Sequence, residues 1–219
     1  QVTVLIHSGS RGFGYQVCDD FLKKMSESVR RLGLELPDRQ LACDFIQSPT
    51  GQDYFSGMAC AANYAWVNRQ MLMHWTREVF ERFLKMGPKD IGMHLVYDVC
   101  HNIAKREWHT IGGELREVCV HRKGATRAFP SGHPAVPADY RAVGQPVLIP
   151  GDMGRYSYVL VGTEGAMGET FGSTCHGAGR VQSRTQAKKA SKGRPLQREL
   201  EDRGIFVMAA SREALAEEA

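Results

Sequence analysis

The spacing of hydrophobic residues predicts two helices in the first part of the chain. Over residues 15–32 they recur at intervals of three or four, at Val17, Phe21, Met25, Val29 and Leu32. A glycine follows at once, which is typical of a helix end. Residues 51–86 form a second helical stretch, or a pair of helices, rich in Ala, Met and aromatic residues. It ends before Pro88, because proline cannot continue a helix.

Short hydrophobic runs, separated by loops that contain Gly and Pro, predict strands. We expect strands over residues 1–6, 92–99, 117–121, 146–149, 156–162 and 204–210, and one more helix over 181–190. The strands do not alternate regularly with helices, as they would around a parallel sheet. The pattern therefore indicates an α+β class, with a mostly antiparallel sheet core flanked by helices.

Composition excludes several classes of protein. The 219 residues carry 28 Lys+Arg against 24 Asp+Glu and are 42% hydrophobic, which is the balance of a globular chain. No run of 18 uncharged apolar residues is present, so we expect neither a membrane span nor a signal peptide. The six cysteines include no C-x-x-C pair, so reduced thiols and a cytoplasmic location are expected. The chain starts inside a predicted strand without Met, and we expect it to be part of a longer polypeptide.

The basic residues are concentrated near the end of the chain. Residues 180–198 contain seven Lys or Arg and no acid, whereas 199–219 contain six acids. Such a run suits a phosphate-rich partner, because each cation that neutralises a phosphate releases a counterion. A solvated helix face would give the same pattern.

Two histidines are candidate metal ligands. His7 and His101 each follow a predicted strand and open onto a loop, where a rigid sheet can present side chains to a site. Imidazole is the commonest metal ligand in proteins, and its second nitrogen needs an orienting partner. Asp98, three residues before His101, is the candidate for that role.

A third histidine is a candidate nucleophile. His176 lies among glycines and other small residues, whose backbone N–H groups can approach a phosphate closely. An imidazole in such a cradle can attack phosphorus and form a phosphoramidate. The thiol of Cys175 is the alternative nucleophile. Adjacent side chains of a strand point to opposite faces, so the two do not form a nucleophile–base pair.

Two further segments have open interpretations. Residues 120–134, VHRKGATRAFPSGHP, form either an oxyanion clamp or a charged surface loop. In residues 149–162, Pro150 and Gly151 form a turn, and Ser157 could read a base edge. The chain lacks the Walker, G-x-S-x-G and zincin motifs, which argues against the corresponding enzyme classes.

Several of these segments together resemble a known family. HSGSRG, DVCHNIAK, VHRKGATRAFP, PGDMG, SYVLVGT and ETFGSTCHGAGR occur in the order found in RtcB, the GTP-dependent RNA-splicing ligases. The resemblance covers essentially the whole chain. It implies that residues 1–219 are a partial RtcB-like catalytic domain, with the upstream and extreme C-terminal parts of the family missing.

The resemblance implies a role for each matching residue. His176 would be the catalytic residue that takes up GMP, and His7 and His101 would bind manganese. Arg180 and Arg184 would contact RNA phosphate. The guanylate-binding residues would be His101, Asn102, Pro150, Gly151, Asp152, Met153, Ser157, His176, Gly177, Ala178 and Gly179. Asp152 stands where the family usually has Ser. The hydrogen bond that this Ser would make to guanine is therefore not carried over to Asp152.

The resemblance also implies a reaction. Such ligases join 2′,3′-cyclic-phosphate or 3′-phosphate ends to 5′-hydroxyl ends through a guanylated histidine, in tRNA splicing or RNA repair. The expected cofactors are two Mn²⁺ ions and GTP. The expected partners are tRNA halves or broken RNA ends, and an archease-type activator. A metal-dependent phosphoesterase, or an RNA-binding segment that is inactive by itself, are the alternatives.

Overall fold

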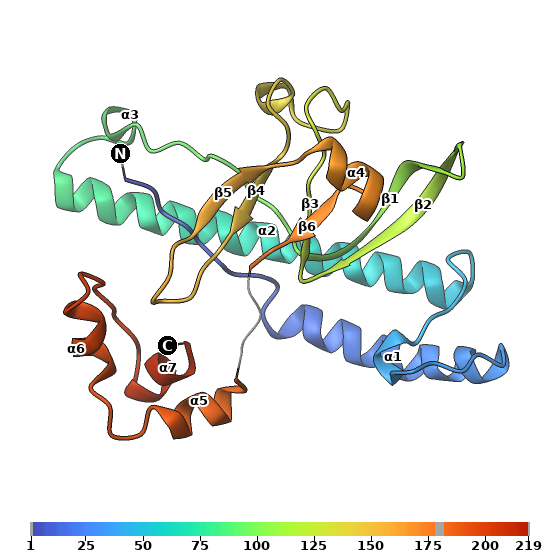
Figure 1. Cartoon of the computed structure of the whole chain (residues 1–219), viewed down its shortest axis with the longest axis horizontal. Coiled ribbons are helices and arrows are strands. Elements are labelled where there is room, and N and C mark those ends of the chain that lie inside the picture. Colours follow the sequence, from blue (N-terminus) through green and yellow to red (C-terminus); the bar gives the residue numbers. More distant parts are fainter. Residues whose placement is uncertain (1, 178–181, 219) are drawn as a thin grey trace. The chain divides into compact units, whose positions relative to one another are not determined.

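The computed structural model describes residues 2–177 and 182–218 (Figure 1). The chain divides into two compact units, residues 1–103 and 104–219.

Two long helices build the first unit. Helix α1 (Gly12–Arg31) packs along α2 (Pro49–Leu84), and the short elements η1 (Arg39–Leu41) and α3 (Pro88–Ile91) accompany them (Figure 1). The helices approach closely at Gly57 of α2, where a Cβ would lie 3.2 Å from Cγ1 of Val17. Ser48 caps α2, because its Oγ accepts a hydrogen bond from Gly51 N at 3.0 Å. The hydrophobic face predicted for α1 thus packs against α2.

Both predicted helices of this unit are confirmed, and α2 is one continuous helix of 36 residues. The predicted strands 1–6 and 92–99 are wrong. Residues 2–9 and 93–100 have no regular secondary structure, and no described strand pairs with either segment. A hydrophobic run becomes a strand only when a second strand satisfies its backbone N–H and C=O groups, which the run itself cannot specify.

Three antiparallel pairs of strands build most of the second unit. Strands β1 (Asn102–Ile111) and β2 (Glu114–Lys123) form a hairpin. Its two turn residues, Gly112 and Gly113, have φ values of 60° and 85°, a conformation that favours glycine. Strand β3 (Ala125–Arg127) pairs with β6 (Ser173–Cys175), and β4 (Pro146–Ile149) pairs with β5 (Tyr158–Val161).

Short helices complete the second unit. The η2 turn (Ala138–Tyr140) lies between β3 and β4, and α4 (Glu164–Thr170) precedes β6. Helices α5 (Arg184–Ala190), α6 (Leu196–Glu201) and α7 (Arg212–Glu218) follow. The largest fully buried hydrophobic side chains near the strands are those of Phe129, Val136 and Val147. A separate hydrophobic cluster joins α6 and α7, made by Leu196, Leu200, Leu215 and Ala216.

The α+β class with antiparallel strands is confirmed, and among the described residues the strands form three two-stranded sheets. The strand predictions at 117–121, 146–149 and 156–162 are confirmed by β2, β4 and β5, and the helix predicted over 181–190 by α5. The strand predicted over 204–210 is wrong. Ile205 and Val207 pack against the α6–α7 cluster while Phe206 and Met208 are exposed. Buried and exposed side chains thus alternate along this segment as in a strand, although it has no regular secondary structure.

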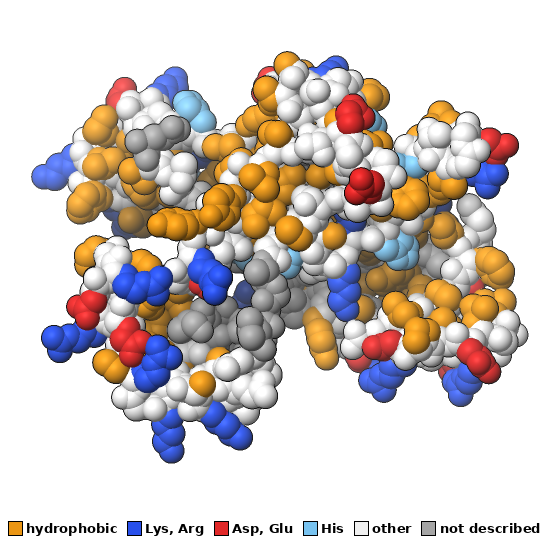
Figure 2. All heavy atoms as spheres, viewed as in Figure 1, with side chains coloured by type: hydrophobic (Ala, Val, Ile, Leu, Met, Phe, Trp, Pro, Cys, Tyr) orange, Lys and Arg blue, Asp and Glu red, His pale blue; other side chains and the backbone are white. Residues whose placement is uncertain are grey.

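Large hydrophobic side chains also lie at the surface (Figure 2). Phe83 at the end of α2 is 83% exposed, and Tyr156 before β5 is 82% exposed. No helix among the described residues is both long enough and apolar enough to cross a bilayer.

Candidate active site

In the first unit, the two histidines expected to bind metal lie next to each other. Nε2 of His7 is 3.0 Å from Nε2 of His101, and the two rings meet edge to face with centroids 5.2 Å apart. The sequence analysis expected sheet strands to present these residues. Instead, His7 lies in the segment before α1 and His101 at the end of the segment before β1.

The spacing of the two nitrogens fits a shared cation. With metal–nitrogen bonds of about 2.1 Å, two imidazoles on adjacent positions of one ion place their nitrogens roughly 3 Å apart. A neutral imidazole presents one lone pair, so each of these rings can offer its Nε2 to such an ion. His7 and His101 therefore have the donor chemistry and the separation that a divalent metal site requires.

Side chains of α2 hold the two segments that carry these histidines. Arg69 donates from Nε to Asp98 Oδ1 at 2.8 Å and from Nη1 to Ser8 O at 3.3 Å. Asn68 donates from Nδ2 to Ser8 Oγ at 2.8 Å and to Gly9 O at 2.9 Å. Asp98, expected to orient His101, thus has Arg69 as an ion-pair partner. The sequence analysis missed both α2 residues, because nothing in the helical pattern distinguishes them.

In the second unit, the candidate nucleophile directly follows β6. The pairing of β3 with β6 places Ala125 opposite Cys175, which brings His176 next to Gly124. Nδ1 of His176 is 3.1 Å from Gly124 O. A carbonyl oxygen only accepts hydrogen bonds, so this contact requires the proton on Nδ1. The lone pair of the neutral ring is then on Nε2, the nitrogen that can attack an electrophile.

The loop between β4 and β5 lies against this histidine segment. A Cβ on Gly177 would be 2.7 Å from Pro150 O, so the two backbones approach more closely than any side chain allows. The loop also closes on itself, since Gly151 N donates to Ser157 Oγ at 3.1 Å. The structure therefore brings together Pro150, Gly151, Ser157, His176 and Gly177 of the predicted guanylate site. The absence of a side chain at Gly177 is thus what lets its backbone pack against Pro150 O.

The remaining residues of this loop have other partners. Asp152 accepts a hydrogen bond from Gly154 N at Oδ1, 2.8 Å away, and pairs through Oδ2 with Arg155 Nε at 3.3 Å. Met153 packs against the α6–α7 cluster. The Asp152 carboxylate thus stabilises the turn of its own loop.

Other predicted site residues are only partly described. Asn102 is exposed at the start of β1. Arg184 begins α5, whose first turn is closed by a capping box between Ser183 and Gln186. The predicted guanylate residues Ala178 and Gly179, and the RNA-contacting Arg180, lie outside the described residues.

Replacing Gly177 with alanine tests the close approach at Pro150. The Cβ would meet a backbone oxygen, so one of the two segments must move. If this segment binds the guanylate that the family resemblance implies, the KM for GTP of the full-length protein rises about tenfold. Gly168→Ala is the matched control, because a Cβ at Gly168 in α4 meets no atom within 4 Å. Covalent labelling with α-labelled GTP measures both variants. Equal KM values for Gly177→Ala and the control would contradict the assignment.

A buried ion pair contacts β6 and holds it in place. Arg122 donates from Nη1 and Nη2 to the two carboxylate oxygens of Glu107, each at 2.8 Å, and from Nε to Ser173 Oγ at 2.8 Å. The side chains of Arg122 and Glu107 are 1% and 5% exposed. Burial raises the pKa of Glu107, but the hydrogen bonds and charge of Arg122 outweigh it, and the net pKa is lowered. Arg122 thereby ties the hairpin to the strand that precedes His176.

The basic segment 120–134 is used largely for packing. It forms the end of β2 and all of β3, and the predicted surface loop is confined to its later part. The guanidinium of Arg127 lies over the Phe129 ring at 4.8 Å, and the His133 ring packs 4.1 Å from the same ring. Burial, followed by the charge of Arg127, lowers the pKa of His133. Arg122, Arg127 and His133 thus stabilise the fold, whereas His121 and Lys123 are exposed, and the oxyanion clamp stays a prediction.

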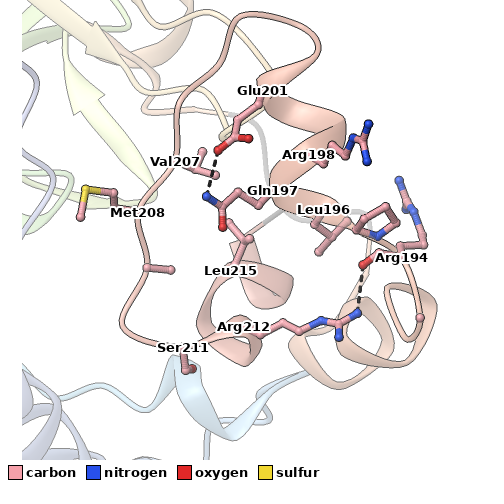
Figure 3. Close-up of a pocket in the computed structure, with 13 residues that line it drawn as sticks. Arg194, Leu196, Gln197, Arg198, Glu201, Val207, Met208, Ser211, Arg212 and Leu215 are labelled. Carbon is pink, nitrogen blue, oxygen red and sulfur yellow. Dashed lines mark hydrogen bonds between the residues drawn. The ribbon is translucent and has the colours of Figure 1, made fainter.

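A hollow of about 770 Å³ lies among α6, α7 and the segment between them (Figure 3). Leu196 and Leu215 of the hydrophobic cluster line it, together with the charged Arg194 and Arg212. Arg212 donates to Arg194 O at 3.0 Å, which holds one side of the hollow together. None of the predicted site residues lines it.

Comparisons with known proteins agree with the resemblance. A family model described as tRNA-splicing ligase RtcB matches residues 1–219. The tRNA-splicing ligase RtcB of Archaeoglobus fulgidus is 60% identical over 218 residues, covering 100% of this chain and 45% of the relative. The proteins of the same name from Methanocaldococcus jannaschii and Thermococcus kodakarensis are each 57% identical over 219 residues, covering 100% of this chain and 23% and 45% of the relatives. The chain thus spans less than half the length of these curated relatives. Because the family model matches every residue, the chain belongs to the tRNA-splicing ligase RtcB family.

Proposed function

We propose that this chain carries the nucleophile and part of the metal site of an RNA ligase that acts in tRNA splicing or RNA repair. Its substrates would be a 2′,3′-cyclic-phosphate or 3′-phosphate RNA end and a 5′-hydroxyl end, with GTP as the activating nucleotide. Family membership and the names of the relatives support a ligase acting on tRNA. The chemistry of His176 supports the guanylation step.

The hydrogen bond between His176 and Gly124 carries the proposal. Because Gly124 O holds the proton on Nδ1, Nε2 is the nucleophilic nitrogen of the neutral ring. Nε2 would attack the α-phosphorus of GTP, forming an N–P bond while the bond to the β-phosphate oxygen breaks and pyrophosphate leaves. The backbone of Gly177, next to His176, would lie beside the phosphates of the bound nucleotide.

The RNA steps follow from the reactivity of that intermediate. GMP would pass from His176 to the RNA 3′-phosphate, and the 5′-hydroxyl oxygen would then attack that phosphorus and release GMP. This sequence gives the bare 3′-phosphate the leaving group that it lacks. A cyclic phosphate would first be hydrolysed to the 3′-phosphate. The cations of α5, among them Lys189, would neutralise RNA phosphates.

We assign the metal site to His7 and His101, whose nitrogens have the separation expected for ligands of one ion. Manganese, the ion that the family resemblance implies, would withdraw charge from phosphate oxygens when bound. The two imidazoles must be neutral to serve as ligands, and α2 holds their segments in place. An archease-type activator and a cytoplasmic location stay predictions.

Covalent labelling tests the proposal. The full-length protein is incubated with α-³²P-GTP and Mn²⁺, and the label is followed after denaturation. We expect label that is stable in alkali and released by acid, as for a phosphoramidate, and that transfers to an RNA 3′-phosphate. Hydrolysis of phosphate esters without any label would favour the phosphoesterase alternative. Salt-sensitive RNA binding with neither activity would favour an RNA-binding role.

A further inference from the structure

We propose that Arg69 is a positioning residue that sets the separation of His7 and His101. The inference rests on the proposed function only for what the two rings bind. Both histidines lie outside the helices and strands of the described residues, His101 just before β1, so the regular hydrogen bonding of an element does not by itself fix the position of either ring. Ring nitrogens 3.0 Å apart nevertheless require two well-placed segments.

The guanidinium of Arg69 contacts both segments at once. Nη1 donates to Ser8 O, next to His7, while Nε and Nη2 bind Asp98 Oδ1 at 2.8 and 2.7 Å. Nη2 also donates to Cys100 Sγ at 3.7 Å, next to His101. The planar guanidinium holds its N–H donors in fixed directions, so it can bind these separate acceptors at the same time. A lysine ammonium on a flexible stem does this less well. Arg69 therefore links the segment that carries His7 to the segment that carries His101.

Two other side chains of α2 each bind one of the two segments. Asn68 binds only the first segment, through Ser8 Oγ and Gly9 O. Arg77 binds only the start of the second, by donating to Met93 O at 3.1 Å. Arg69 lies between these two anchors and is 11% exposed, so its bonds are shielded from water. Without Arg69, Asn68 and Arg77 would still attach each segment to α2. The link between the two segments next to the histidines would be lost.

Amide hydrogen exchange in the metal-free, full-length protein tests the coupling. In Arg69→Gln we expect exchange about tenfold faster in residues 8–11 and in residues 98–101, because both lose a bond. In Asn68→Ala we expect faster exchange in residues 8–11 only. Arg82→Gln is the matched control on the same helix, since among the described residues Arg82 donates only to Glu78 O of its own helix. Arg69→Lys should be intermediate.

Manganese affinity, measured by titration calorimetry, is the second readout. We expect Arg69→Gln to weaken Mn²⁺ binding about 10- to 100-fold, as for residues that orient metal ligands, with unchanged helix content by circular dichroism. Unchanged exchange in residues 98–101 would overturn the inference, as would unchanged Mn²⁺ affinity in Arg69→Gln while His101→Ala abolishes binding. If the wild type binds no Mn²⁺, the metal assignment fails, and the exchange result alone decides whether Arg69 couples the segments.

Discussion

The His176→Ala variant is expected to lose covalent labelling by GTP, by more than about 10³-fold, because no other group replaces the attacking nitrogen. The expectation follows from the tautomer that Gly124 O imposes, which leaves Nε2 as the nucleophile. His176→Asn sharpens the test, since its amide can donate to Gly124 O but offers no nucleophilic nitrogen. Label is measured after denaturation, at saturating GTP and Mn²⁺.

Two controls accompany this experiment. Cys175→Ser removes the alternative nucleophile, whose thiol is exposed at the end of β6, and labelling should persist. His74→Ala removes an exposed histidine of α2 that pairs only with Glu78 among the described residues, and it should label like the wild type. Persistent label in His176→Ala, or loss of label in Cys175→Ser alone, would reassign the nucleophile.

Replacing Arg122 with methionine is expected to lower the free energy of unfolding by about 3–5 kcal/mol, the usual cost of leaving one buried charge without its partner. Glu107 would remain, 5% exposed, without the two hydrogen bonds of the guanidinium. Ser173 Oγ would also lose its bond from Arg122 Nε. Urea unfolding of the full-length protein at pH 7 measures the loss. We expect labelling of His176 to weaken too, because β6 loses support.

The pH dependence of this loss identifies its cause. In the wild type the pKa of Glu107 is lowered from its usual 4.5, so its contribution to stability is present above pH 4.5 and lost as the pH falls further. Without Arg122, only the contact with His109 Nε2 at 3.2 Å and the charge of Arg127 still lower that pKa, whereas burial, the largest single cause, raises it. Protonation of Glu107 should then stabilise the folded variant. The difference in unfolding free energy between the two proteins should therefore shrink as the pH falls from 7 towards 4.5.

A double variant separates charge from packing. Glu107→Leu combined with Arg122→Met replaces the ion pair with hydrophobic side chains, which often costs little stability. His109 Nε2, 3.2 Å from Glu107 Oε2 in the wild type, also loses that contact. We expect it to recover most of the stability lost in Arg122→Met. A double variant as unstable as Arg122→Met, with the same deficit at pH 5 as at pH 7, would show that the loss comes from packing.

The periodic parts of the chain could be predicted because their physics is local. The helical spacing from Val17 to Leu32 and the proline after α2 indicate where α1 and α2 lie, and a continuous run of four apolar residues sufficed to predict β4. The order of the short motifs determined the family, and the small residues around His176 marked a candidate nucleophile. Each of these inferences needs only neighbours within one turn or one strand.

Only the tertiary structure decided what holds the candidate site. The segments before α1 and before β1 are as hydrophobic as strands, yet they form none, and Asn68 and Arg69 of α2 hold them instead. The proton position on His176 depends on Gly124, 52 residues earlier in the chain. The sequence places Arg122 in either an oxyanion clamp or a charged surface loop, whereas in the structure it is buried against Glu107. These contacts join residues that are remote in the chain, and a side chain's partner across such a distance is set by how the elements pack, which local residue patterns do not encode.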